Sequence, residues 1–183
     1  MTTTHIRFAT LADAPALYEL IERAYRDPAT AGRWDSESHL FSGPRTTLYE
    51  IRGLLDDPDS RFVVAEADGR IVGCAMIQNA LSSASASDVP TDRDAYFGMF
   101  AIAAEYRSAG LGKTILAECE RRARELWNAP GLMMTVISVR DELIAWYGRR
   151  GYLPTGARTP FPFSGETGET RRDFDLIVLR KAF

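Results

Sequence analysis

The residues best suited to chemistry stand in segment 96–114, where an apolar run is followed by a turn of small residues and then by a helical pattern. Backbone N–H groups at a helix N-terminus lack intrahelical partners, and that end carries roughly +0.5 of an elementary charge from the peptide dipoles. Glycines at positions 110 and 112 let a ligand approach this backbone closely. The segment therefore predicts an anion site suited to a phosphate or pyrophosphate.

Two familiar glycine motifs do not fit this turn. A nucleotide-binding P-loop requires a glycine five residues before Gly112, and Arg107 stands there instead. A dinucleotide-binding fingerprint requires Gly or Ala at position 115, where the chain has Ile115, and it follows the first strand of a repeated unit, which this turn does not. Both interpretations are therefore disfavoured.

The spacing that does fit is Arg-x-x-Gly-x-Gly, formed by Arg107, Gly110 and Gly112. A second pattern, an aromatic residue and Tyr followed by Gly and Tyr, occurs at Trp146-Tyr147 and Gly151-Tyr152. With these two motifs in this order, the sequence resembles the GCN5-related N-acetyltransferase (GNAT) superfamily over about residues 5–180.

The resemblance implies acetyl-CoA as co-substrate and no metal. The pyrophosphate would bind the backbone of the glycine turn, with charge added by two basic side chains. The peptide-like pantetheine arm would pair with the edge of the preceding strand, where an N–H near Ala101 or Ile102 would polarise the thioester carbonyl. The residues implied in cofactor binding are Phe100, Ala101, Ile102, Arg107, Ser108, Ala109, Gly110, Leu111, Gly112, Lys113 and Thr114.

Tyr147 is the side chain that the resemblance favours as general acid, because a phenol can protonate the CoA thiolate as it leaves. The alternative is that Tyr147 is a core aromatic beside Trp146. One departure from the family pattern lies seven residues earlier, where many relatives have an asparagine and this chain has Arg140. Any cofactor contact of that side chain is therefore left open.

The general base is less well defined by the sequence. Relatives often use a carboxylate on the fourth strand, but the corresponding position here is Tyr96. Asp94 lies on the same face of the strand two residues earlier. His39 titrates near neutral pH and is a second candidate. A chain of water molecules is a third possibility.

The acceptor amine is expected to bind between the loop that joins the first two helices and the last hairpin. Aromatic residues there would form an apolar wall, and Arg45 would bind a carboxylate with two hydrogen bonds. The residues proposed for the acceptor are Trp34, His39, Phe41, Arg45, Tyr96, Phe161 and Phe163.

Three functions remain open from the sequence. The first is an N-acetyltransferase for a small-molecule amine such as an amino acid, a polyamine or an antibiotic-like amine. The second is a protein acetyltransferase acting on an N-terminal or lysine amine, and the third is a non-catalytic acyl-CoA sensor. Closure of the site by residues 154–168 would favour the first function, and a broad open groove would favour the second.

The elements that must position these residues follow from hydrophobic periodicity and turn signals. The Asp68-Gly69 pair predicts a hairpin, and a strand on each side of the helix after the glycine turn predicts a parallel pair. The fold expected is of the α+β class: a mixed, mostly antiparallel sheet of about seven strands, parallel between the fourth and fifth, with about four helices. Expected strands are 5–9, 61–67, 70–79, 96–102, 132–138, one from Tyr152 and 173–180; expected helices are 13–26, 46–55, 113–127 and 141–149, and 154–168 is expected to be irregular.

Length and composition set the remaining expectations. The chain has 183 residues, enough for a single domain over 1–183, and a net charge of −3, which gives no basic field for nucleic acid. Its two cysteines, at 74 and 119, lie far apart in apolar segments, as expected for buried thiols in a reducing compartment. The absence of a long apolar run predicts no membrane span, and we expect a cytoplasmic protein. A homodimer is possible in such a fold.

Overall fold

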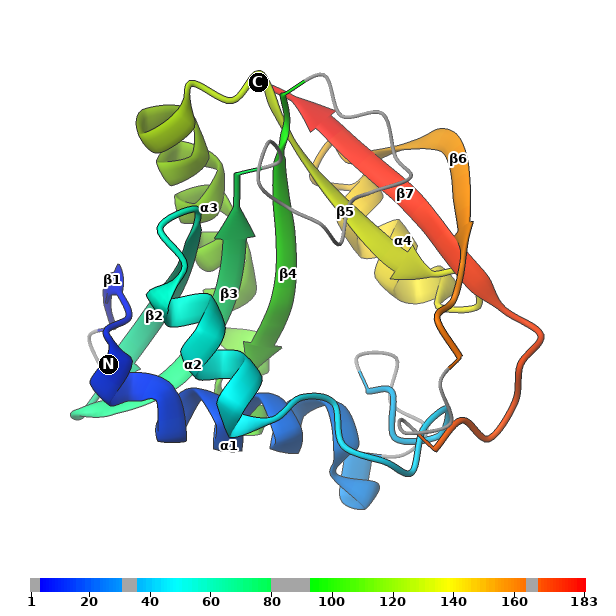
Figure 1. Cartoon of the computed structure of the whole chain (residues 1–183), viewed down its shortest axis with the longest axis horizontal. Helices are drawn as coiled ribbons and strands as arrows, with labels where there is room; N and C mark the ends of the chain where they lie inside the picture. Colours follow the sequence, from blue (N-terminus) through cyan, green and yellow to red (C-terminus); the bar gives the residue numbers. More distant parts are fainter. Residues whose placement is uncertain (1–3, 31–35, 80–92, 164–167) are drawn as a thin grey trace.

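The computed structural model describes residues 4–30, 36–79, 93–163 and 168–183. Within them the chain forms seven strands and four α-helices in the order that the sequence predicts (Figure 1). The strands are β1 His5–Phe8, β2 Ser60–Ala67, β3 Arg70–Gln78, β4 Ala95–Ile102, β5 Gly131–Ile137, β6 Leu153–Pro160 and β7 Asp175–Ala182. The helices are α1 Ala14–Arg26, α2 Leu48–Asp56, α3 Leu111–Trp127 and α4 Asp141–Gly148, and a 3-10 helix, η4 Ala104–Ala109, precedes α3.

All seven strands belong to one sheet with the order β1-β2-β3-β4-β5-β7-β6. The β4–β5 pair, joined across α3, is parallel, and the other pairs are antiparallel. Helices α1 and α2 cover one face and α3 and α4 the other (Figure 1). Each face has its own core, one centred on Leu17, Ile21 and Phe62 and the other on Ile115, Leu116 and Leu132. This confirms the expected fold class.

Strands β4 and β5 pair only over a short stretch. The paired residues are Ala95 with Leu132 and Tyr96 with Met133, after which the two strands diverge (Figure 1). Beyond Tyr96, one edge of β4 therefore has no neighbouring strand. Where two parallel strands of a sheet separate, the gap can admit a ligand whose own polar groups replace the missing strand.

A β-bulge at Met99 changes which side chains of β4 face each helix layer. Met99 has a φ of +47°, and residues Met99 and Phe100 together stand opposite Ala75 of β3. As a result Phe97 packs in the core under α3, whereas Met99 and Ala101 pack in the core under α1. An unbroken strand would place all three on one face. The side chains of β4 therefore do not alternate simply between the two faces of the sheet beyond residue 98.

Several boundaries differ from the expected ones. Residues 154–160, expected to be irregular, continue β6 to Pro160. This is possible because β6 is the last strand of the sheet, where a proline that cannot donate a ladder hydrogen bond is tolerated. Helix α3 begins at Leu111 rather than at residue 113, and η4 fills part of the expected turn. Helix α2 begins at Leu48, with Thr47 as its N-cap accepting from the N–H of Glu50.

Candidate active site

Two adjoining cavities open where β4 and β5 diverge. The larger has a volume of about 300 Å³ and the smaller about 120 Å³. They share residues from both helix layers, Tyr25 from α1 and Tyr147 from α4, so the gap between the strands connects the two faces of the sheet. The residues common to both linings are Tyr25, Phe100, Arg140, Leu143 and Tyr147.

The glycine turn borders the smaller cavity. Gly110 adopts a φ of +77°, a left-handed conformation that glycine adopts at little cost, and it caps the N-terminus of α3. No atom lies within 4 Å of a Cβ built on Gly110, so the space over this turn is open. A Cβ on Gly112, by contrast, would lie 3.1 Å from the Phe100 ring and 3.6 Å from that of Trp146. Open space over the N–H groups that begin α3 fits the bound pyrophosphate that the sequence predicts.

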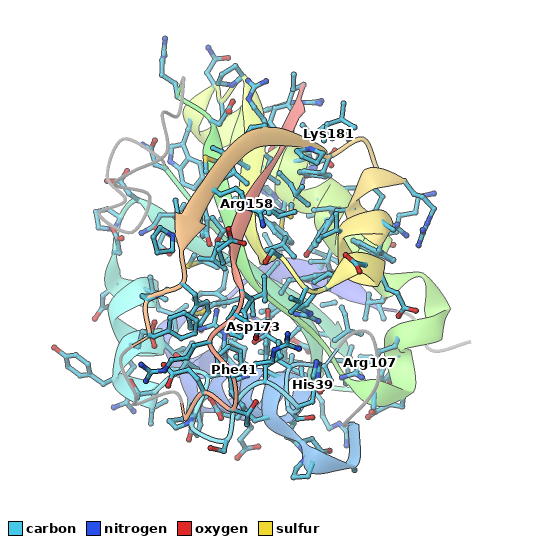
Figure 2. All side chains as sticks on the ribbon, turned by 90° about the vertical axis from the view of Figure 1, so that its right-hand side faces the viewer. His39, Phe41, Arg107, Arg158, Asp173 and Lys181 are labelled. Atoms are coloured by element: carbon cyan, nitrogen blue, oxygen red, sulfur yellow. The ribbon has the colours of Figure 1, made fainter. Side chains whose placement is uncertain are left out.

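The side chain of Arg107 points back toward β4 and lines the smaller cavity. Its Nε donates to the carbonyl oxygen of Ile102 at 3.2 Å (Arg107 is labelled in Figure 2). Lys113 and Thr114 are exposed in the first turn of α3, beside the same opening. Of the residues that the sequence assigns to the anion, Arg107 and Gly112 thus line one cavity, whereas Lys113 and Thr114 are not in its lining.

The free edge of β4 presents the backbone of alternate residues. Ala103 donates to the carbonyl of Val72 in β3 at 2.8 Å, so its polar groups face β3. Alternation then turns Ala101 toward β3 as well and leaves the polar groups of Phe100 and Ile102 on the free edge. The carbonyls of these two residues indeed accept from side chains outside the sheet, Tyr25 and Arg107. Phe100 and Ile102, rather than Ala101, thus have backbone groups available to an extended ligand.

Tyr147 lies at the junction of the two cavities. Its side chain is buried, with the rings of Phe97 and Tyr152 packed edge-on at centroid distances of 6.4 Å and 5.9 Å. Burial raises the pKa of its phenol well above the usual value, so it keeps its proton at neutral pH. Within the described residues, no hydrogen bond occupies its hydroxyl. Tyr147 is therefore placed and protonated as a proton donor requires.

Tyr25 is a site residue that the sequence analysis missed. Its hydroxyl donates to the carbonyl of Phe100 at 3.0 Å, and burial raises its pKa to about 12. In the sequence it belongs to the apolar stripe of α1, which is typical of a core residue. The feature of the sequence that could have identified Tyr25 as a site residue is its position in the last turn of that helix, just before the break at Asp27-Pro28.

Neither residue proposed as the general base lines a cavity. Asp94 is buried beside Gly131 and accepts two hydrogen bonds from Arg180, at 2.5 Å and 2.9 Å, which neutralise its charge. His39 is exposed on the loop between α1 and α2, where its backbone carbonyl accepts from Thr170 (Figure 2). The structure therefore does not position either side chain to take a proton from an amine bound in the larger cavity.

Most residues proposed for the acceptor do line the larger cavity. Phe41 and Phe161 stack at a centroid distance of 5.3 Å, and the Tyr96 hydroxyl lies 3.1 Å from that of Thr135 across the gap between β4 and β5. Arg45 also lines this cavity, with its guanidinium carbon 5.2 Å from the centre of the Tyr25 ring. Phe163 packs on Phe161 at 4.9 Å behind the lining. Trp34 lies outside the described residues.

Charged residues that the sequence analysis did not assign complete this lining. Glu37 is buried between two arginines: Arg140 donates to it at 2.7 Å and Arg26 at 3.2 Å. The contact of Arg140, left open above, is thus an ion pair with Glu37. These residues come from the end of α1, the following loop and the N-terminus of α4, so only the folded chain brings them together. Sequence spacing gives no signal for this cluster.

In the described ranges, no three side chains of the His, Cys, Asp and Glu types form a group that would hold a metal ion. No helix in that same part of the chain is long and apolar enough to cross a bilayer.

Solved structures with the same fold include several acetyltransferases. The ribosomal-protein-alanine N-acetyltransferase of Brucella melitensis superposes with a TM-score of 0.70 at 22% identity, covering 98% of this chain and 99% of its own. Arabidopsis thaliana NAA60, solved in complex with a bisubstrate analogue, superposes with a TM-score of 0.69 at 15% identity, covering 99% of both chains. At these identities the likeness shows a shared fold.

Sequence comparison extends the likeness to the family. The amino-acid acetyltransferase of Mannheimia succiniciproducens is 24% identical over 147 residues, which are 80% of this chain; the chain spans only 26% of that relative's length. The model of the acetyltransferase (GNAT) family matches residues 15–152, well over half of the chain. The protein therefore belongs to the acetyltransferase (GNAT) family.

Proposed function

We propose that the protein transfers the acetyl group of acetyl-CoA to the primary amine of a small molecule. The observation that carries this proposal is the size and lining of the larger cavity. Phe41, which lines this cavity, forms a β-bridge with Glu169, the N–H of Ser42 donates to Gly168 at 2.9 Å, and the N–H of Thr170 donates to Leu40 at 2.9 Å. Two loops that are distant in sequence are thereby joined beside Phe41. A cavity of about 300 Å³ suits a small ligand better than a protein segment.

Acetyl-CoA would bind along the smaller cavity. Its pyrophosphate would accept from the N–H groups that begin α3, and its pantetheine amides would pair with Phe100 and Ile102 on the free edge of β4. The molecule would supply an acetyl thioester, an acyl donor already activated toward amines. Its acetyl end would then lie near Tyr147, where the two cavities meet.

In the reaction, the lone pair of the acceptor nitrogen attacks the thioester carbonyl carbon. A C–N bond forms and the C–S bond breaks, and its electron pair leaves with the sulfur. The Ile102 N–H stabilises negative charge that develops on the carbonyl oxygen, and the Tyr147 hydroxyl gives the sulfur its proton. The nitrogen loses one proton to solvent, from which Tyr147 is reprotonated, so charge and atoms balance.

The proton lost by the nitrogen goes to water in this proposal. The acidic side chain that lines the larger cavity in the described part of the chain is Glu37, and its two oxygens are held by Arg140 and Arg26. Both carboxylate oxygens are thus already engaged by guanidinium groups and are not placed to take a proton from the amine. The acceptor would therefore react as the free amine, present as a small fraction at neutral pH and replenished by fast exchange with water.

Acetylation of protein N-termini is the alternative that the comparisons raise. The ribosomal-protein-alanine N-acetyltransferase described above acts on a protein by name, but it is too distant in sequence to indicate more than the fold. The relative with the amino-acid substrate supports the small-molecule proposal.

The test is a panel of amines incubated with acetyl-CoA while released thiol is measured. The panel contains amino acids, polyamines, aminoglycosides and short peptides with free N-termini. We expect at least one small molecule to be acetylated with a kcat/KM at least roughly a hundredfold above that of any peptide. Mass spectrometry of the product identifies the acetylated nitrogen. Turnover of peptides alone would contradict the proposal.

A further inference from the structure

We propose that the acceptor of this acetyltransferase is an amine that carries a carboxylate and an apolar side group, and that Arg45 binds the carboxylate. This inference rests on the proposed function, because it assigns the substrate class of the same cavity. The argument uses the charge of the lining, the contacts of Arg45 and the apolar wall opposite it.

The larger cavity is strongly positive for its size. The charged side chains among the described residues of its lining are three guanidinium groups, of Arg26, Arg45 and Arg140, and one carboxylate, of Glu37, which gives a net charge of +2. In so small a space the effective dielectric constant is far below that of water. An acceptor with several positive charges, such as a polyamine, would be repelled, and an anionic group would be attracted.

Within this cluster, Glu37 already engages two of the three arginines. The side chains of Glu37, Arg26 and Arg140 are each about 10% exposed or less, and the ion pairs measure 2.7 Å and 3.2 Å. Their role is to hold the loop after α1 against the N-terminus of α4. The third guanidinium, of Arg45, forms no ion pair with any carboxylate in the described residues. It is therefore the group available to a ligand.

The position of Arg45 is fixed by its backbone and by one aromatic ring. The N–H groups of Arg45 and Thr46 both donate to the Glu22 carboxylate, at 2.7 Å and 2.8 Å, which ties this loop to α1. The guanidinium lies over the ring of Tyr25, at 5.2 Å from its centre. An arginine anchored in this way presents a planar fork of donors, which matches the two oxygens of a carboxylate.

Tyr25 also sets the distance between the acid and the amine. One face of its ring contacts Arg45, and its hydroxyl contacts the Phe100 carbonyl at the edge where the acetyl group would lie. The carboxylate and the amine of the acceptor would therefore both bind beside this one tyrosine. Two sites that adjoin the same side chain suit an amino acid, in which the two groups are close neighbours, better than a long chain with the groups at opposite ends.

The remaining wall of the cavity is apolar. Phe41 and Phe161 stack on each other, and Ile137, Met134 and Leu176 lie beside them in the lining. Burial of apolar surface against such a wall contributes roughly 25 cal/mol per Å². An acceptor with a branched or aromatic side group would gain this contribution, whereas glycine would not.

The test compares matched acids and amides in both turnover and binding. Leucine, methionine and phenylalanine are each paired with the corresponding amide, and thiol release from acetyl-CoA gives kcat/KM. Equilibrium binding of N-acetyl-phenylalanine and of its amide is measured by calorimetry, which needs no turnover. We expect the acid of each pair to be favoured by roughly tenfold to a hundredfold, the range for one charged hydrogen-bonded contact.

Variants of Arg45 assign this preference to one side chain. R45Q should abolish the preference for the acid while leaving the dissociation constant of acetyl-CoA unchanged, and R45K should retain only part of the preference because it keeps the charge without the fork. R158Q is the matched control: Arg158 is an exposed arginine of β6 that pairs with Asp175 (Figure 2), and its loss should change neither quantity.

Each outcome separates this inference from the proposed function. If acids and amides are acetylated equally well, or R45Q keeps the preference, the inference is wrong and the proposed function stands. If no small molecule is acetylated but the acid binds more tightly than the amide and loses that advantage in R45Q, the site assignment stands and the proposed function fails. If neither acid nor amide binds at millimolar concentration, the inference is overturned.

Discussion

The Tyr25 hydroxyl donates a hydrogen bond of 3.0 Å to the carbonyl oxygen of Phe100 and so ties the last turn of α1 to the free edge of β4. That carbonyl would otherwise face the gap left by β5 without a partner. The contact therefore fixes the strand edge on which the pantetheine arm would lie, and it also joins this edge to the ring that supports Arg45. The proposed sites for acetyl-CoA and for the acceptor amine thus share Tyr25.

Replacing Tyr147 by phenylalanine tests the proton donor. The ring contacts with Phe97 and Tyr152 remain in Y147F, so the fold and the binding of acetyl-CoA should be unchanged. Loss of the hydroxyl should lower kcat roughly a hundredfold, in the range usual for general acid catalysis, with little change in KM. Stopped-flow measurement of thiol release, with acetyl-CoA binding followed by tryptophan fluorescence, gives both quantities.

The matched control for this change is Y49F, since Tyr49 is 89% exposed on α2 and should be silent. An undiminished kcat in Y147F would show that another group protonates the sulfur. An absence of turnover in the unmodified protein would instead favour the interpretation of the protein as an acyl-CoA sensor.

Local patterns in the chain were enough to identify residues that the fold brings together around the smaller cavity. The glycine turn and the Trp146-Tyr147 pair are each defined by spacing within a few residues, and such spacing can be recognised without knowledge of the fold. The parallel pair β4–β5 also follows from one rule, that a strand–helix–strand connection runs parallel. For these features, sequence and structure agree closely.

The acceptor side could not be predicted in the same way. Arg26, Glu37 and Arg140 come together only after the loop behind α1 is joined to segment 168–170 and folded against α4. Asp94 is a suitable base by residue type, but its pairing with Arg180, 86 positions later, removes it from that role. The bulge at Met99 reverses the side-chain alternation of β4, and neighbouring residue types do not specify it. These features depend on contacts between distant segments.

Adding a methyl group at Gly112 tests the cofactor cavity. In G112A the Cβ would lie 3.1 Å from the Phe100 ring and 3.6 Å from Trp146, inside the lining of the smaller cavity. We expect acetyl-CoA to bind roughly tenfold more weakly, because the Phe100 ring in the wall of this cavity must shift to make room for the methyl group. The free energy of unfolding should change little, because the cost of the close contact with Phe100 is offset by the higher helix propensity of alanine, about 1 kcal/mol.

G53A provides the comparison for the backbone effect alone. Gly53 is also helical, and no atom lies within 4 Å of a Cβ built there. This variant should be slightly more stable and should bind acetyl-CoA as the unmodified protein does. Equal weakening in both variants would argue against a cofactor cavity at Gly112.

The ion pair between Arg7 and Asp13 should make stability depend on acid pH. Arg7 donates to both carboxylate oxygens, at 2.8 Å and 2.9 Å, which lowers the pKa of Asp13 from 3.8 to about 2. A group whose pKa is lower in the folded state stabilises the fold above its unfolded pKa and loses that effect as pH falls toward its folded pKa. D13N should therefore lower the free energy of unfolding by about 1 kcal/mol at neutral pH, and this difference should shrink as pH falls through about 4 and disappear only below about pH 2. Urea denaturation at a series of pH values measures this; a constant difference down to the lowest pH would be inconsistent with the ion pair.

Glu37 should be far more important for stability than an exposed glutamate. In E37Q the buried guanidinium groups of Arg26 and Arg140 lose the charge that compensates them, which typically costs about 3 kcal/mol or more. E118Q breaks ion pairs with Arg121 and Arg122 on the outer face of α3 and should cost less than about 1 kcal/mol.

The double variant E37Q/R140M should recover part of the loss, because it removes one of the two uncompensated charges. Urea unfolding of the unmodified protein, E37Q, R140M and E37Q/R140M gives the coupling free energy between positions 37 and 140. A value near zero would mean that the ion pair does not hold the loop against α4.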